Sequence, residues 1–152
     1  MPTPVIVSGE VAIARSPQEI FDVLADPTAW FTIDEALVDV QPRERLVPGV
    51  SGTMRRRVGP GLKVTTAWEN TALRPGVRIE MLITGFGYEL HESVVLSGDP
   101  AGTRVTVVDA LSPTSLIGRV MVAASRRIVQ RDLDTRFAKL KSMLESRPAT
   151  SV

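Results

Sequence analysis

The feature that most constrains the fold is a stretch of about 75 residues, from Leu37 to Leu111, in which apolar and polar side chains alternate with a period of two. Turn-forming residues interrupt it at residues 48–49, 59–61, 75–76, 85–87 and 98–102. Because these turns are short, no helix can cross between strands, which excludes a parallel sheet. The pattern predicts an antiparallel meander with strands at residues 37–46, 52–58, 63–73, 77–84, 88–97 and 103–111.

One more strand and two short helices are predicted before the meander. Apolar side chains alternate over residues 5–14, which indicates a strand. Ser16 is placed to cap a helix whose first residue is Pro17. Asp26-Pro27 ends that helix, and the spacing of the apolar residues that follow predicts a second helix over residues 27–33.

A long amphipathic helix is predicted after Pro113, because about 30 residues follow without another proline. Its apolar residues form two stripes, made of Ile117, Met121, Ala124 and Ile128, and of Leu133, Phe137, Leu140 and Leu144. The offset between the stripes near residues 130–132 predicts a bend. We expect the first half of this helix to border a cavity and the second half to be packed core.

The composition excludes several classes of protein. Lys plus Arg is 18 and Asp plus Glu is 17, so the net charge of +1 gives no field that would favour general binding of nucleic acid. The chain has no cysteine and one histidine, His91, which excludes disulfides, thiolate metal sites, a thiol nucleophile and a metal site with several imidazoles. We therefore expect no metal and no cofactor.

Length and hydropathy set the expected organisation of the chain. A length of 152 residues predicts one domain, at residues 1–146, followed by a flexible tail at residues 147–152. The longest apolar run, residues 120–124, is far too short to cross a bilayer, and the N-terminal residues lack the pattern of a secretory signal. A cytoplasmic location is the expectation that follows.

The order of these elements resembles a known superfamily. The matching stretches are residues 16–27 with Trp30 downstream, residues 102–107 and residues 131–144, and the likeness extends over about residues 5–144. They resemble the START-like, Bet v 1-like helix-grip superfamily, and within it the bacterial SRPBCC proteins of the polyketide cyclase/dehydrase type. This resemblance implies an α+β helix-grip fold: a curved antiparallel sheet of about seven strands, two short helices, and a long C-terminal helix that encloses a cavity for an apolar or amphipathic small molecule.

Alternation along the strands also predicts which side chains face the long helix. The inward set is Val64, Thr66, Trp68, Asn70, Val77, Ile79, Met81, Ile83, Tyr88, Leu90, Glu92, Val94, Leu96, Val105, Val107, Asp109 and Leu111. His91 falls on the opposite, solvated face. Within the Arg55-Arg56-Arg57 run, Arg56 points to the side opposite its two neighbours.

Four polar residues stand within the apolar inward set, namely Asn70, Tyr88, Glu92 and Asp109. Buried carboxylates need partners, and the candidates on the long helix are Arg126, Arg127 and Arg131. Two interpretations stay open at this point. The four residues belong to the packed core and its ion pairs, or they line a ligand pocket where perturbed carboxyl groups often collect.

The favoured function is binding of a hydrophobic or amphipathic small molecule, lipid-like or polyketide-like, by a monomer or homodimer. Its candidate ligand-binding residues are Trp68, Asn70, Met81, Ile83, Tyr88, Leu90, Glu92, Val107, Asp109, Met121, Ala124 and Ile128. One alternative is a cyclase or dehydratase in which Glu92 or Asp109 moves protons. Another is a protein-interaction or toxin–antitoxin accessory module that uses the arginine-bearing helix or the outer face of the sheet as its contact surface.

Overall fold

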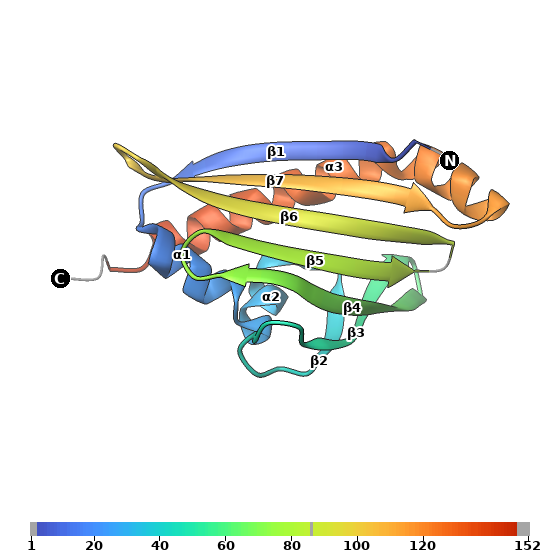
Figure 1. Cartoon of the computed structure of the whole chain (residues 1–152), viewed down its shortest axis with the longest axis horizontal. Helices are drawn as coiled ribbons and strands as arrows, with labels where there is room; N and C mark the ends of the chain where they lie inside the picture. Colours follow the sequence, from blue (N-terminus) through green and yellow to red (C-terminus); the bar gives the residue numbers. More distant parts are fainter. Residues whose placement is uncertain (1–2, 86, 149–152) are drawn as a thin grey trace.

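A computed structural model describes residues 3–85 and 87–148. Its elements in chain order are β1 (Val5–Ile13), α1 (Pro17–Leu24), α2 (Pro27–Ile33), β2 (Leu37–Gln41), β3 (Ser51–Gly59), β4 (Leu62–Arg74), β5 (Arg78–Gly85), β6 (Tyr88–Asp99), β7 (Gly102–Pro113) and α3 (Leu116–Glu145). The seven strands form one antiparallel sheet in the order β1-β7-β6-β5-β4-β3-β2. Figure 1 shows α3 lying along one face of this curved sheet, with α1 and α2 on the same side. The predicted α+β helix-grip fold is confirmed.

The first two helices begin where the sequence places them. The Ser16 hydroxyl accepts a hydrogen bond from the backbone N–H of Glu19, and Asp26 accepts one from the N–H of Thr28, so each helix has a side-chain cap. Proline opens both helices, at Pro17 and Pro27. The apolar side of α1 and the end of α2 then pack into the core beside the sheet.

Two details of the meander differ from the prediction. The strand predicted at residues 37–46 ends at Gln41, because Pro42 has no N–H with which to continue the ladder. The chain then leaves the sheet, and the N–H of Leu46 bonds to the carbonyl of Ala25. Val77 was predicted to face inward but is 44% exposed, because it lies in the turn before β5.

The rest of the inward face follows the predicted alternation. Trp68, Val105 and Asp109 are almost completely buried, whereas His91 is exposed on the outer face. The register places Glu92 of β6 directly opposite Asp109 of β7 and opposite Met81 of β5. A carboxyl pair is therefore set into the apolar inner face at mid-sheet.

The buried side of α3 is a single stripe rather than two offset ones. It consists of Gly118, Val122, Leu133, Phe137, Leu140 and Leu144, with Val129 half-buried between the two groups. The prediction that Met121, Ala124 and Ile128 border the cavity is wrong, because all three lie on the exposed side of the helix. Gly118 and Ser125 occupy inward positions but have no large apolar side chain. The pattern of apolar residues in the sequence therefore indicated the neighbouring side of the helix, which faces solvent.

The start of α3 touches the turn between β5 and β6 through two glycines. A Cβ atom placed on Gly118 would lie 1.7 Å from the carbonyl oxygen of Gly87, so no side chain fits there. Gly87 has a φ of 81°, a backbone conformation that glycine adopts readily. Farther along, the Gln130 side chain donates to the carbonyl of Ser8 and Lys141 donates to that of Ala12, which ties α3 along β1.

Candidate functional site

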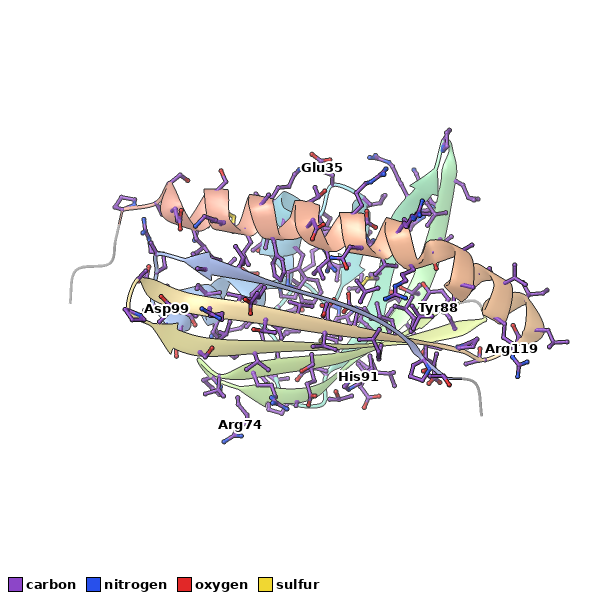
Figure 2. The ribbon with its side chains drawn as sticks, turned by 90° about the horizontal axis from the view of Figure 1, so that it is seen from above. Glu35, Arg74, Tyr88, His91, Asp99 and Arg119 are labelled. Atoms are coloured by element: carbon purple, nitrogen blue, oxygen red, sulfur yellow. The ribbon has the colours of Figure 1, made fainter. Side chains whose placement is uncertain are left out.

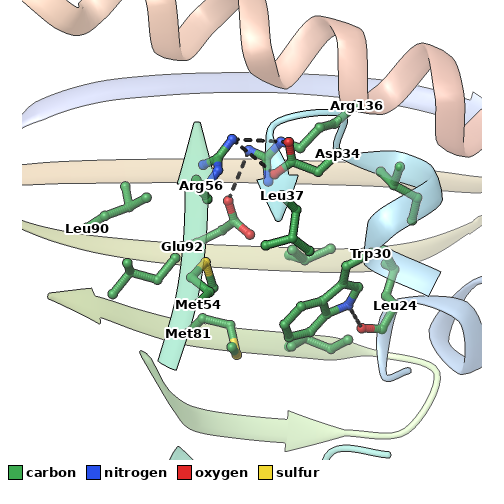
Figure 3. Close-up of a pocket in the computed structure, with 14 residues that line it drawn as sticks. Leu24, Trp30, Asp34, Leu37, Met54, Arg56, Met81, Leu90, Glu92 and Arg136 are labelled. Carbon is green, nitrogen blue, oxygen red and sulfur yellow. Dashed lines mark hydrogen bonds and ion pairs between the residues drawn. The ribbon is translucent and has the colours of Figure 1, made fainter. Parts of the chain in front are cut away.

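A pocket of about 140 Å³ lies between the inner face of the sheet, the first two helices and the second half of α3. Its walls are formed by Leu24, Trp30, Ile33, Asp34, Leu37, Met54, Arg56, Ile79, Met81, Ile83, Leu90, Glu92, Val94 and Arg136. A second space of about 60 Å³ continues toward Leu133, Phe137 and Leu140, and it shares Glu92 and Arg136 with the first. Figure 3 shows the pocket with charged groups gathered at one end and apolar side chains at the other.

The apolar end of the pocket is built around Trp30. Its indole N–H donates to the carbonyl of Leu24 at 2.9 Å, which fixes the ring against the pocket. Trp68 packs behind it in an edge-to-face arrangement, with ring centroids 5.8 Å apart. Methionine side chains at Met54 and Met81 complete this wall, and such unbranched thioethers adapt to different ligand shapes.

The charged end combines two arginines with three carboxyl groups. Arg56 of β3 pairs with Asp34 at 3.0 Å. Arg136 of α3 lies 3.4 Å from the nearest Glu92 oxygen and 3.8 Å from the nearest Asp109 oxygen. Four separate elements therefore meet there: the segment after α2, strands β3 and β6, and helix α3, with Asp109 of β7 behind them.

The two facing carboxyl groups have opposite protonation behaviour. Burial and the neighbouring Glu92 charge raise the pKa of Asp109 to about 9. Burial is the largest single influence on Glu92 and raises its pKa, but the Arg136 charge, hydrogen bonding with Asp109 and Arg136, and the Arg56 charge together outweigh it, so the pKa of Glu92 falls below its ordinary value. At neutral pH Asp109 therefore holds a proton, while Glu92 and Arg136 form a charged pair.

Several polar atoms at this end are buried without a hydrogen-bond partner within residues 3–85 and 87–148. They include the Nε atoms of Arg56 and Arg136 and both carboxyl oxygens of Asp109. Each orphaned N–H costs free energy until something accepts from it. Both arginines also line the pocket, with 28% and 25% of their side-chain surface exposed, so we expect an oxygen of a bound molecule to accept from their terminal nitrogens rather than from the enclosed Nε atoms.

Replacing Asp109 by asparagine should flatten the dependence of stability on pH. Between the unfolded value near 3.8 and about 9, the folded protein binds one more proton than the unfolded chain, so the free energy of unfolding falls as pH rises. The contribution is about 1.4 kcal/mol per pH unit, or about 2 kcal/mol between pH 6 and pH 7.5. Urea unfolding at these two pH values would measure it. Glu89→Gln, on the exposed outer face, is the control, and equal slopes for Asp109→Asn and the parent would contradict the assignment.

The structure brings together about half of the residues predicted to bind a ligand. Met81, Ile83, Leu90 and Glu92 line the larger space, while Val107 and Glu92 line the smaller one. Asp109 has no exposed surface and lines neither space, but it lies behind two residues that do, Glu92 and Arg136.

The other predicted residues lie elsewhere. Trp68 belongs to the core behind Trp30. Asn70 is also buried, and its amide donates to the carbonyls of Ala72 and Glu80 at the point where the pairing of β4 and β5 shifts register. Tyr88 is half-buried at the start of β6 and does not line either space. Met121, Ala124 and Ile128 lie on the exposed side of α3, away from both spaces. Trp30, Trp68 and Phe86 are, from the sequence, a candidate aromatic mouth for a pocket, and Phe86 falls outside the described residues.

Arg136 is the main site residue that the sequence analysis missed. Partners for the carboxyl groups were expected at Arg126, Arg127 or Arg131, but all three are exposed. A signal for Arg136 was present, because it lies three residues after Leu133 and four before Leu140, within the apolar stripe of α3. A lone charge inside an apolar stripe indicates a buried partner.

The fold and this pocket define a helix-grip domain with an amphipathic internal cavity. A family model described as polyketide cyclase/dehydrase and lipid transport matches residues 4–145, and the chain belongs to that family. It thereby falls in the SRPBCC, Bet v 1-like superfamily. No curated protein matches it in sequence.

Solved structures share this fold at low sequence identity. Protein CV1439 from Chromobacterium violaceum is 16% identical, with 95% of this chain and 99% of that one covered and a TM-score of 0.77. Ara h 8.0201 is 14% identical, with 95% and 99% covered and a TM-score of 0.71. The di-domain ARO/CYC StfQ from the steffimycin biosynthetic pathway is 13% identical, with 95% and 52% covered and a TM-score of 0.79, so the chain corresponds to about half of it.

Two further observations concern metals and membranes. Within the described part of the chain, no group of three or more His, Cys, Asp or Glu side chains is arranged to hold a metal ion. None of the helices seen there is both long enough and apolar enough to span a bilayer.

Proposed function

We propose that the protein binds a small amphipathic molecule with an apolar ring or short chain and one oxygen acceptor. The apolar part would lie against Trp30, Met81 and Leu90, and the oxygen would accept from Arg56 and Arg136. The observation that supports this proposal is the pair of partly exposed arginine side chains, Arg56 and Arg136, at the charged end of an otherwise apolar pocket. Such a site combines a largely hydrophobic wall with a few convergent polar groups.

The size of the pocket limits the ligand class. Engineered protein cavities of about 150 Å³ hold one benzene ring. The space of about 140 Å³ observed here therefore suits a single substituted ring or a short chain, and the adjoining 60 Å³ leaves room for a substituent. An aromatic acid or ketone meets both the size and the hydrogen-bonding requirement, whereas a long acyl chain would need the pocket to open.

Calorimetric titration with benzoate, acetophenone and toluene tests this proposal. We expect the two oxygen-bearing probes to bind more tightly than toluene. Arg56→Gln should weaken benzoate binding by about 10-fold to 100-fold, because a hydrogen bond to a charged group is lost, while leaving toluene binding nearly unchanged. Leu90→Trp should block all three probes because it fills the pocket.

The control for the filling variant is Leu62→Trp, which adds the same indole at a position that is 58% exposed. Binding of all three probes by Leu90→Trp at the parent's affinity would show that the pocket is not the site. Equal affinity of the parent for toluene and benzoate would remove the assigned role of the arginines.

A second candidate function is proton transfer, in which Glu92 takes a proton from a bound ketone and the arginines steady the resulting enolate. The observation in its favour is that Glu92 lines the pocket within 3.4 Å of Arg136. Asp109 does not reach the pocket, so a pair of catalytic carboxyl groups is not supported, and the lowered pKa of Glu92 makes it a weak base. Unchanged turnover of a candidate ketone by Glu92→Gln would reject this mechanism.

We also propose that residues 1–146 act as one domain in the cytoplasm, as a monomer or homodimer. The interaction-module alternative would use the arginine-bearing side of α3 or the outer face of the sheet.

A further inference from the structure

The first half of α3 exposes large apolar side chains. Leu116 is 77% exposed, Val120 70%, Ile117 62%, Ile128 62% and Met121 41%. Gly118 and Val122 face the protein, so these five side chains point away from it. A contiguous apolar surface of this kind on a soluble domain marks a contact site.

Only positive charges accompany this apolar surface. Residues 116–131 contain Arg119, Arg126, Arg127 and Arg131, all exposed, and no aspartate or glutamate. None of the four arginines forms an ion pair with any residue that the structure describes. The net charge of +1 for the whole chain therefore conceals a strongly basic segment at one end of the molecule.

Exposed apolar residues are more frequent in the first two turns of the helix and arginines in the turns that follow, although Arg119 lies within the first group and Ile128 within the second. The first two turns present Leu116, Ile117 and Val120, while Arg127 and Arg131 follow on the same side. At 1.5 Å per residue, Val120 and Arg127 are about 10 Å apart along the axis. Figure 2 shows this end of α3, with Arg119 labelled, projecting beyond the end of the sheet.

We propose that this surface docks onto a lipid bilayer that contains anionic lipids. The apolar side chains of the first two turns enter the boundary between headgroups and acyl chains, and the arginines lie at the level of the lipid phosphates. Interfacial helices bury their apolar side about 5–10 Å deep and gain further affinity from basic residues near the surface. Helix α3 offers both residue types on its exposed side, namely large apolar side chains and arginines without acidic partners in residues 116–131.

A second copy of the chain fits this surface less well. A symmetric dimer would pair the surface with itself and place the four arginines of each copy within one interface. Residues 116–131 supply no carboxylate to offset that repulsion. A layer of anionic phosphates provides the missing charge, which is the reason to assign the surface to a membrane. This inference does not depend on what the pocket binds.

Flotation with lipid vesicles tests the proposal. We expect the protein to float with phosphatidylcholine vesicles that contain 30% phosphatidylglycerol, and not with pure phosphatidylcholine, with weaker binding at high salt. Ile117→Ser with Val120→Ser should reduce binding at least tenfold. Arg127→Gln with Arg131→Gln should reduce it by about 25-fold, since each arginine near the surface contributes about fivefold.

Matched controls make the same changes elsewhere on the surface. Val47→Ser with Val77→Ser alters two valines that are 57% and 44% exposed, and Arg74→Gln with Arg147→Gln removes two exposed arginines. Both control pairs should bind like the parent, and circular dichroism checks that every variant is folded.

Three results would overturn the proposal: no flotation of the parent with either vesicle, equal flotation with both, or equal losses in the test and control pairs. A dimer in light scattering that Ile117→Ser with Val120→Ser dissociates would assign the surface to a second copy instead.

Discussion

Replacing Arg136 by methionine is expected to lower the free energy of unfolding by about 3 kcal/mol at pH 7.5. The change leaves Glu92 charged in an apolar wall without the cation that lies 3.4 Å from it. The loss falls at the lower end of the range for a broken buried ion pair, because 25% of the Arg136 side chain reaches solvent. Urea unfolding measures the effect.

The pH dependence of this loss identifies its cause. Without Arg136, burial raises the pKa of Glu92 above its unfolded value, so the penalty is present at neutral pH and disappears as pH falls toward that unfolded value, near 4.5. The double variant Glu92→Gln with Arg136→Met should recover most of the stability at pH 7.5. Arg127→Met, on the exposed side of α3, is the control and should change stability by less than about 0.5 kcal/mol. A loss that does not vary with pH would point to packing rather than charge.

Replacing Trp68 by alanine should cost about 3–5 kcal/mol, the usual range for removing a large buried aromatic side chain. Trp68 is 2% exposed, its indole N–H donates to the carbonyl of Thr53 at 3.1 Å, and its ring supports Trp30. The same change should loosen the pocket wall, because Trp30 loses the ring behind it. Thermal and urea unfolding measure the first effect, and benzoate titration measures the second.

Trp68→Phe separates the two contributions. It retains a ring beside Trp30 but loses the hydrogen bond to Thr53, so we expect a smaller loss of stability and nearly normal ligand binding. If Trp68→Ala unfolds at the parent's urea concentration, then the side chain does not hold this part of the core together.

The sheet could be predicted from the sequence because its signals are local. Strand alternation and short turns identified the meander and most of its inner face, including Trp68, Glu92 and Asp109. The helix cap at Ser16 is likewise encoded within a few residues of chain, whereas Asp26, predicted only to end the first helix, also caps the second. Strand alternation, turns and helix caps each depend on residues that are neighbours in the sequence, so the sequence alone is enough to predict them.

The rotation of α3 could not be predicted in the same way. Its inward positions include Gly118 and Ser125, which carry too little apolar surface to appear in a hydropathy pattern. The exposed apolar residues beside them gave the stronger signal and led to the wrong side of the helix. Their exposure is the observation that leads to the proposed membrane contact.

The charged end of the pocket depends on contacts between distant parts of the chain. Arg56, Asp34 and Arg136 meet only after β3, the segment after α2, and α3 have packed together. Neither their spacing nor their residue types reveal this meeting. What the sequence did reveal was that two buried carboxyl groups required a cation.

The contact between Gly87 and Gly118 also determines the direction in which Arg136 points. Arg136 follows Gly118 by 18 residues, which is about five full turns of an α-helix, so the two residues lie on the same line along α3. Because the glycine contact holds this side of α3 against the sheet, the Arg136 guanidinium points into the pocket. The same contact leaves the apolar side chains of the first turns facing outward. One backbone contact at the end of the helix thus sets the angular position of both the internal site and the outer surface.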